Sequence, residues 1–221
     1  MQESEAGAVS RGFFIVFEGI DGSGKTTQIK RLAKRMRDAG REVEVTCEPT
    51  ENLNGQLIRR MLRGEIPYCP ETMAALFVAD RLDHILSERY GMLRALEKGI
   101  SVLSDRYYFS SFAYHGSEIP MKPVIRANSV ASSILRPDLN IYLDITPETA
   151  LVRLADSGKV LDIFESLNMK AQSDRRTKYF EAFEVLEEET VAIIDGEGDV
   201  EEVEQRVLQA VRERLQCELL A

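Results

Sequence analysis

The chain has 221 residues, of which 44% are hydrophobic and 29% are charged, and its 37 acidic and 28 basic side chains give a formal net charge of −9. This composition predicts a folded protein with a hydrophobic core, and the length favours one large domain. The acidic balance argues against sequence-independent binding to nucleic acid, which needs a surplus of Lys and Arg. It leaves open an acidic small-molecule substrate, because a local basic cleft can lie on an acidic surface.

We expect neither a membrane partner nor export. No run approaches the roughly 20 apolar residues that a membrane span needs, and residues 1–11 lack the apolar centre of a secretory signal. Cys47, Cys69 and Cys217 have no metal-like spacing, so free thiols in the cytoplasm are expected. We expect residues 1–12 to form a flexible tail and residues 13–221 to form a single domain.

Short apolar runs alternate with long amphipathic stretches along the chain. Strands are predicted at residues 13–17, 43–46, 100–103, 139–143 and 191–194. Helices are predicted at residues 25–39, 54–62 and 71–97, then from Thr146-Pro147, and finally from a capping pair formed by Asp199 and Glu202. Buried strands that alternate with helices predict an α/β fold, with a five-stranded parallel sheet covered on both faces.

Residues 156–173 interrupt this alternation. The segment is polar, contains Gly158 and lies between two predicted helices. A mobile flap and a plain surface connection both fit the pattern.

The strongest local motif is a G-x-x-x-x-G-K-[ST] loop at residues 19–26, between a predicted buried strand and a predicted helix. Its glycines let backbone N–H groups point at one centre, where the helix N-terminus adds positive potential. Lys25 would reach the β- and γ-phosphates of ATP, and Thr26 would offer a hydroxyl to Mg²⁺. An ordinary glycine-rich turn is the alternative. The expected nucleotide contacts come from Gly19, Ile20, Asp21, Gly22, Ser23, Gly24, Lys25, Thr26 and Thr27.

The class of nucleotide-binding protein is narrowed by two missing motifs. No Asn is followed by Lys, as guanine recognition in GTPases would need, and no predicted strand ends in Asp-Glu, as in helicases. The third strand leads instead into Asp105-Arg106. Asp105 can hold Mg²⁺ or its waters, and Arg106 could grip a second anion opposite the γ-phosphate. A surface ion pair at a strand end is the alternative for this dipeptide.

Five segments in register along the chain resemble thymidylate kinases, with the archaeal and bacterial branches nearest. They are FEGIDGSGKTTQ at residues 17–28, TCEPT at 46–50, LFVADR at 76–81, DRYYFSSFAYHG at 105–116 and RPDLNIYLDITPETA at 136–150. The resemblance implies a three-layer P-loop NTPase-type fold with a lid at about residues 156–173. It also implies transfer of the γ-phosphoryl group of ATP to dTMP, Mg²⁺ as the metal, and a homodimer.

For one pair of residues, the spacing along the sequence itself suggests a contact with the acceptor. Phe77 and Arg81 are four residues apart and share a helix face, so a ring could stack on a base while a guanidinium donates to its carbonyl. The alternative is that Phe77 belongs to the core and Arg81 pairs with an acid. We read His84 and His115 as structural or exposed. The resemblance implies further acceptor contacts from Asp21, Glu48, Pro49, Arg106, Ser110, Ser111 and Tyr114, and an adenine contact from Arg153.

The chain departs from the family pattern at two arginines. Ser157 replaces the Arg expected before Gly158, which leaves Lys159, Lys170, Arg175 and Arg176 as basic residues in or beside the lid. We hypothesise that turnover is slow, or that Lys159 or Arg176 joins Lys25, Asp105 and Arg106 as a catalytic residue. Cys47 stands where an Arg is expected at the acceptor phosphate, and Arg59 or Arg60 could compensate.

Two other functions remain open at this point. One is a kinase of the same fold that acts on another deoxynucleotide or on a nucleoside, for which Glu48 is the candidate base. The other is a nucleotide-dependent binding module with impaired catalysis.

Overall fold

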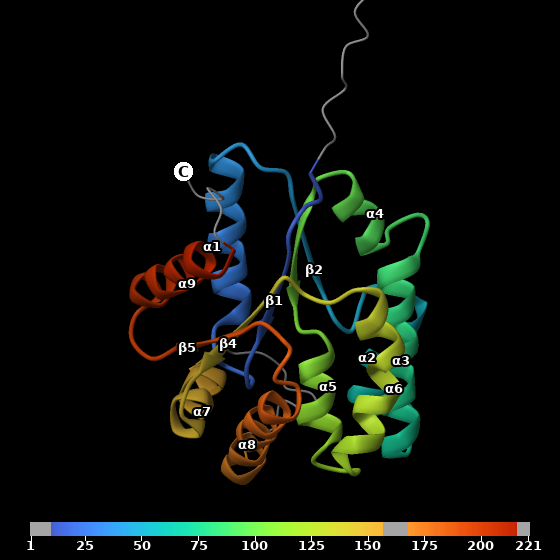
Figure 1. Ribbon diagram of the computed structural model, residues 1–221. Coiled ribbons are helices and arrows are strands. Elements are labelled where there is room, and N and C mark those ends of the chain that lie inside the picture. Colours follow the sequence, from blue (N-terminus) through green and yellow to red (C-terminus); the bar gives the residue numbers. More distant parts are fainter. Residues whose placement is uncertain (1–9, 157–167, 216–221) are drawn as a thin grey trace, which may run out of the picture.

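The computed structural model describes residues 10–156 and 168–215, and within them it contains one five-stranded sheet (Figure 1). The strands run in the order β2-β3-β1-β4-β5, and every neighbouring pair is parallel. This confirms the predicted parallel sheet. The strands are β1 (Phe14–Glu18), β2 (Val43–Cys47), β3 (Ser101–Asp105), β4 (Leu139–Asp144) and β5 (Val191–Asp195).

Helices lie on both sides of this sheet. They are α1 (Lys25–Asp38), α2 (Leu53–Leu62), α3 (Pro70–Leu86), α4 (Met92–Glu97), α5 (Tyr108–His115), α6 (Met121–Ile134), α7 (Pro147–Asp156), α8 (Met169–Val185) and α9 (Val200–Leu215).

The core has two parts, one on each face of the sheet. Phe14 and Val16 of β1 point to one face, where they pack in a cluster with residues of α2, α3, α4, α5, α6 and α8. Ile15 and Phe17 point to the other face and pack against α1 and α9. All four side chains are completely buried, which is why β1 is a continuous apolar run rather than an alternating one. The molecule is therefore a three-layer α/β structure (Figure 1).

One predicted helix, residues 71–97, is wrong in its extent because the structure divides it into α3 and α4. The chain turns between Ser87 and Gly91, and a Cβ atom at Gly91 would lie 2.4 Å from the carbonyl oxygen of Ser87. A glycine is required where the backbone folds back this closely. Helices α5 and α6 are not predicted from the sequence, and every residue of α5 is buried, so it lacks an amphipathic period.

Two predicted helix starts are confirmed. Thr146 Oγ1 accepts from the backbone N–H of Thr149 at 3.2 Å, ahead of the proline that opens α7. At the start of α9, Asp199 Oδ1 accepts from the N–H of Glu202 at 2.8 Å, and the Glu202 carboxylate accepts from the N–H of Asp199 at 3.2 Å. This reciprocal pair is a capping box.

The ends of the predicted tail and lid differ from the expectation. Arg11 forms an ion pair with Asp138, and the N–H of Gly12 donates to the carbonyl of Leu96 at 2.8 Å, so residues 11 and 12 are tied to the domain. Helix α8 begins at Met169, so residues 169–173, at the end of the predicted lid, are helical. Ser157, Gly158 and Lys159 lie outside the described residues, as does Cys217.

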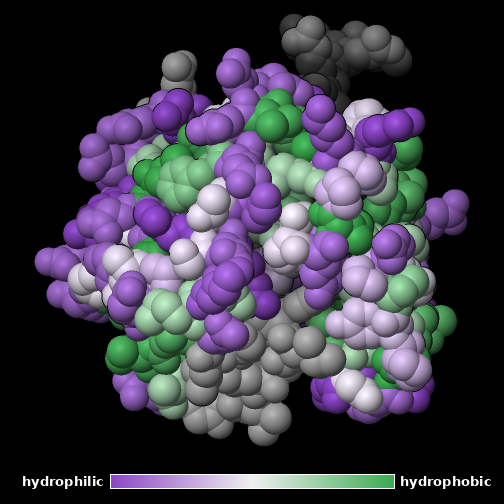
Figure 2. All heavy atoms as spheres, turned by 90° about the horizontal axis from the view of Figure 1, so that it is seen from below, coloured by the Kyte–Doolittle hydropathy of each residue, from purple (hydrophilic) through white to green (hydrophobic). Residues whose placement is uncertain are grey.

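No helix among the described residues is long and apolar enough to cross a membrane. Seen from the end where α7 and α8 lie, hydrophilic side chains dominate the surface and hydrophobic ones are scattered among them (Figure 2).

Candidate active site

The loop between β1 and α1 has the backbone shape that its glycines predict. Gly22 and Gly24 have φ angles of 83° and 91°, in the left-handed region that glycine adopts without strain. A Cβ atom at Gly22 would also lie 2.7 Å from the carbonyl oxygen of Ala150. The loop delivers the N-terminus of α1 to the carboxyl end of the sheet, which favours an anion there.

Lys25, the first residue of α1, is buried inside this loop. Its Nζ donates to the carbonyl oxygens of Gly19 and Ile20, both at 3.0 Å. Burial and the nearby charge of Arg106 lower the pKa of Lys25 to about 8. Burial and Arg106 thus disfavour the protonated form of Lys25, and an anion bound at the loop would stabilise that form.

A first cavity, of about 640 Å³, opens beside the loop. Residues 21–28 line one side, so it includes all of the predicted nucleotide contacts in the loop except Gly19 and Ile20, whose carbonyls accept from Lys25. Arg153 of α7 lines another part of the cavity and donates to the carbonyl of Gly196 through both Nη atoms, each at 3.2 Å. The structure therefore brings Arg153 to the same cavity as the loop.

Thr26 and Asp105 meet at the edge of the first cavity, where Thr26 Oγ1 donates to Asp105 Oδ2 at 2.7 Å. The described residues contain no group of three or more His, Cys, Asp or Glu side chains that could hold a metal ion. Mg²⁺ is commonly held by only one or two protein oxygens together with waters and phosphate oxygens. The hydroxyl and carboxylate pair fits that requirement.

A second cavity, of about 250 Å³, lies between α2, α3, α5 and the turn after β2. It brings together all nine of the predicted acceptor residues although they come from distant parts of the chain. Asp21, Asp105 and Arg106 line both cavities. The other residues that line the second cavity are Cys47, Glu48, Pro49, Arg59, Leu62, Phe77, Arg81, Tyr107, Ser110, Ser111, Tyr114 and His115.

Arg106 stands where the two cavities meet. It is the one non-glycine residue with a positive φ angle, 75°, in the described part of the chain. Its Nη1 donates to Ser110 Oγ at 3.0 Å, and its Nη2 donates to Tyr114 Oη at 2.9 Å and to the carboxylate of Asp21. Burial alone would raise the pKa of Asp21, but the charges of Arg106 and Lys25 outweigh it and lower that pKa. Asp21 is therefore an ionised partner for Arg106.

Glu18, at the end of β1, is a site residue that is not predicted from the sequence. Its buried carboxylate accepts from the backbone N–H groups of Tyr107 and Ser110, at 2.9 and 3.2 Å, and from Ser110 Oγ and Tyr179 Oη, at 2.6 and 2.9 Å. Glu18 thereby caps the N-terminus of α5 from another element. The one hint of this role in the sequence is that Glu18 is an acid at the end of an otherwise apolar strand.

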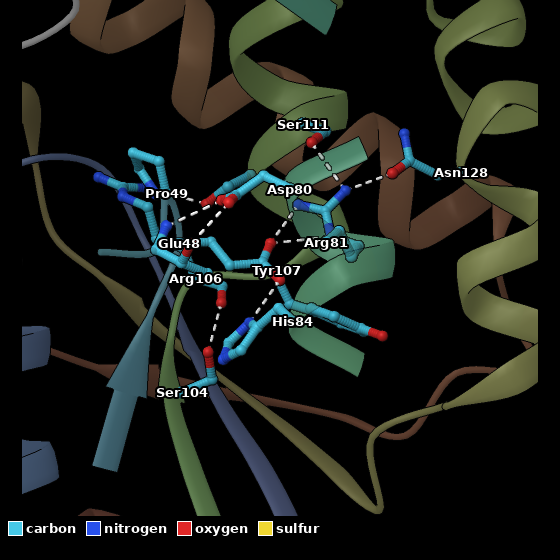
Figure 3. Close-up of polar contacts among 12 residues, drawn as sticks. Glu48, Pro49, Asp80, Arg81, His84, Ser104, Arg106, Tyr107, Ser111 and Asn128 are labelled. Atoms are coloured by element: carbon cyan, nitrogen blue, oxygen red, sulfur yellow. Dashed lines mark hydrogen bonds and ion pairs between the residues drawn. The ribbon is translucent and has the colours of Figure 1, made fainter. Parts of the chain in front are cut away.

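Arg81 is 1% exposed and lies in a polar network between α3 and the turn after β2 (Figure 3). Its Nε and Nη2 donate to Glu48 Oε2 at 2.8 and 2.6 Å, and its Nη1 donates to Ser111 Oγ at 3.1 Å and to Asn128 Oδ1. His84 Nδ1 lies 3.1 Å from Glu48 Oε1. Arg81 thus pairs with an acid, as the alternative expected, and also lines the second cavity. Asn128, on α6, is not predicted from the sequence.

Phe77 lines the second cavity beside His115, and the two ring centroids are 5.0 Å apart. Both histidines, His84 and His115, are buried, so of the two predicted environments the structural one applies. Burial and the charge of Arg81 lower the pKa of His115 to about 3, which makes it a neutral ring at physiological pH.

The basic residues beside the predicted lid occupy different places. Arg176 binds the carboxylate of Asp144 at 2.6 and 2.7 Å and lines neither cavity. Arg175 instead lies 3.7 Å from Asp21 Oδ2, with its guanidinium 4.7 Å from the centre of the Tyr114 ring. Which of the two adjacent arginines faces Asp21 depends on the rotation of α8, and no sequence signal separates them. Lys159 lies outside the described residues.

A parallel sheet with a glycine-rich anion loop, and a second cavity that meets it at a buried arginine, define a P-loop phosphotransferase of the nucleoside monophosphate kinase class. The thymidylate kinase family model matches residues 17–207, and the chain belongs to this family.

Curated relatives agree with this assignment. The chain is 37% identical over 213 residues to the probable thymidylate kinase of Pyrococcus horikoshii, covering 93% of this chain and 98% of that protein. It is 35% identical over 210 residues to the thymidylate kinase of Caldicellulosiruptor saccharolyticus, with coverage of 93% and 98%. It is 33% identical over 201 residues to the thymidylate kinase of Leptospira borgpetersenii, with coverage of 91% and 94%. The predicted family is confirmed.

Proposed function

We propose that this chain transfers the γ-phosphoryl group of ATP to dTMP, giving dTDP and ADP. The observation that carries the proposal is the position of Arg106, which lines both the loop cavity and the second cavity. Two phosphorylated compounds, one in each cavity, would meet end to end at this guanidinium. The relatives named thymidylate kinase support dTMP as the acceptor.

ATP would occupy the first cavity. The backbone N–H groups of the loop would surround its phosphates, and Arg153 would lie against adenine at the far end. Lys25 would exchange the carbonyls of Gly19 and Ile20 for oxygens of the β- and γ-phosphates. Thr26 and Asp105 would hold Mg²⁺ through an oxygen pair already 2.7 Å apart, and the ion would neutralise charge on the phosphates.

dTMP would occupy the second cavity. The ring of Phe77 would stack on the base, and Arg81 would donate to a carbonyl of thymine where cytosine carries an amino donor. Ser111, whose oxygen accepts from Arg81, keeps its own O–H for the base edge. The remaining proposed acceptor contacts are Asp21 and Tyr114 at the sugar, Ser110 at the base edge, Glu48 and Pro49 from the turn after β2, and Arg106 at the phosphate.

The reaction needs positioning more than proton transfer. Phosphoryl transfer passes through a loose transition state, so a protein mainly aligns the reactants and neutralises their charge. An ionised phosphate monoester is already a nucleophile, and no general base is required. Lys25, Asp105 and Arg106 would form the catalytic group. Lys159 and Arg176 remain proposed additions from the lid side.

An ADP-release assay with Mg-ATP and a panel of acceptors tests this function. Release stimulated by dTMP, with dUMP weaker and thymidine inactive, is the expected result. Stimulation by thymidine but not by dTMP would favour a nucleoside kinase, and no stimulation by any acceptor would favour a binding module.

We also propose that the protein is a cytoplasmic homodimer. Exposed apolar side chains on neighbouring α3 and α6, Leu86, Val130 and Ile134, support a partner surface. The free thiols of Cys47 and Cys69 suit a reducing compartment. Sedimentation equilibrium tests the dimer: a monomer at micromolar concentration would contradict it.

A further inference from the structure

We propose that Arg59 of α2 binds the phosphate group of the acceptor in the second cavity. This inference rests on the proposed function, because it takes the acceptor to be a nucleoside monophosphate. It adds a second guanidinium to the one that Arg106 supplies.

The first argument for this role of Arg59 is the balance of charges among the residues that line the second cavity. Its basic lining residues are Arg59, Arg81 and Arg106, and its acidic ones are Asp21, Glu48 and Asp105, the last of which accepts from Thr26 and is the proposed Mg²⁺ ligand. Arg81 is matched by the buried carboxylate of Glu48, and Arg106 by the buried carboxylate of Asp21. A phosphate monoester brings between one and two negative charges, so a cation without a buried counter-charge is needed.

Arg59 is the lining cation that meets this need. Its carboxylate partner is Glu51, at 3.0 Å, and Glu51 does not line the cavity and is 80% exposed. Water screens such a pair, so it neutralises little of the charge of Arg59. An anion in the cavity could therefore replace Glu51 at low cost.

The hydrogen bonds of Arg59 leave donors for an anion. All of its contacts within the described residues use Nη2, which donates to the carbonyl of Pro49 and to Cys47 Sγ and pairs with Glu51. Its Nε is buried and has no hydrogen-bond partner in the described part of the chain. A guanidinium has five N–H donors in a fork that fits phosphate oxygens, so Nη1, which takes part in none of these contacts, is available to an anion, while the buried Nε would need the side chain to turn.

The next residue along α2 provides a matched control. Arg60 pairs with Glu65 at 3.0 Å, has a side chain 55% exposed and does not line the second cavity. The two arginines share a helix and a charge, but only Arg59 reaches the cavity.

Cys47 provides a rescue position. It lines the same cavity, and its Sγ lies 3.7 Å from Arg59 Nη2. Burial raises the pKa of this thiol, so Cys47 itself adds no charge that an anion would meet. An arginine placed there by Cys47→Arg would bring a guanidinium to the same region.

The experiment measures Kd by calorimetry for dTMP and for thymidine, with wild type, Arg59→Ala, Arg60→Ala and Cys47→Arg/Arg59→Ala. We expect Arg59→Ala to weaken dTMP binding by roughly 10- to 100-fold, the size of a lost charge-assisted hydrogen bond. Thymidine binding should stay unchanged, since thymidine has no phosphate. Arg60→Ala should match wild type, and the double variant should recover dTMP affinity. Arg59→Gln, which keeps a polar side chain, replaces Arg59→Ala if that variant unfolds.

Equal losses for dTMP and thymidine, or wild-type dTMP affinity in both Arg59 variants, would overturn the role of Arg59 and leave the proposed function intact. Failure of wild type itself to bind dTMP would overturn the proposed function, and this inference with it.

Discussion

Arg106 and Asp21 are in direct contact at the boundary between the two cavities, and each lines both of them. The contact joins the end of β3 to the loop after β1. Tyr114 binds both residues, because its Oη accepts from Arg106 and donates to Asp21 Oδ2 at 2.7 Å. The guanidinium is thus already oriented before either substrate binds. Such preorganisation is what electrostatic catalysis requires, because no group must be reorganised during the reaction.

The first prediction concerns Arg106 itself. Arg106→Gln should lower kcat for dTMP phosphorylation by roughly 10²–10³-fold, the usual effect of removing one preorganised donor. Arg136→Gln, at an exposed arginine that lines neither cavity, is the control. Steady-state kinetics with saturating ATP and dTMP measures the effect. A loss below about threefold would contradict the account.

The second prediction follows from the pKa of Lys25, about 8 in the free protein. Only protonated Lys25 attracts the triphosphate, so ATP binding should take up protons near pH 8, and ATP affinity should fall as pH rises above that value. The fall approaches about tenfold per pH unit if neutral Lys25 contributes nothing. Calorimetry in two buffers of different ionisation enthalpy measures the uptake. Lys30→Ala, at an exposed position of α1, should keep it, and Lys25→Ala should abolish it. No proton uptake by wild type would exclude this role.

The third prediction tests Glu18 as the cap of α5. Glu18→Ala leaves the N–H groups of Tyr107 and Ser110 without their partner, so the free energy of unfolding should fall by about 2–5 kcal/mol. Glu18→Gln keeps an acceptor oxygen and should recover most of that loss. Glu44→Gln, an exposed acid on β2, is the surface control. Urea unfolding measures all three, and equal stability of Glu18→Ala and wild type would show that the cap is dispensable.

The fourth prediction concerns the buried pair of Arg81 and Glu48. Removal of one partner leaves a buried charge, so Glu48→Ala should lower the free energy of unfolding by about 3–5 kcal/mol. The apolar double variant Glu48→Leu/Arg81→Met should be distinctly more stable than Glu48→Ala, yet it should lose the preference for dTMP over dCMP. Thermal unfolding and acceptor competition measure the two effects. A double variant that still prefers dTMP would show that Arg81 does not read the base.

The parts of the fold that could be predicted are those with a local signal. The five strands were visible as apolar runs, and the loop at residues 19–26 as a motif between a strand and a helix. The break between α3 and α4 is harder to predict, because it depends on the tight turn from Ser87 to Gly91, a close backbone approach that residue spacing does not reveal. Helix α5 was missed because it is buried all round.

In the candidate site, too, some residues could be predicted from a local pattern in the sequence and others could not. Phe77 and Arg81 could be paired from helical spacing, but one of the hydrogen-bond partners of Arg81, Asn128, lies 47 residues further along the chain, on another helix. Glu18 looked like the end of a strand, and only the packing of α5 against it reveals a cap. Contacts of this kind depend on tertiary geometry, which has no counterpart in residue spacing.

The most direct test of the central claim is a crystal structure with ADP and dTMP bound together. The account predicts the phosphates of ADP in the loop at residues 19–26, the phosphate of dTMP on Arg106, and thymine between Phe77 and Arg81. A pyrimidine nucleotide bound away from Phe77, Arg81 and Arg106 would contradict it.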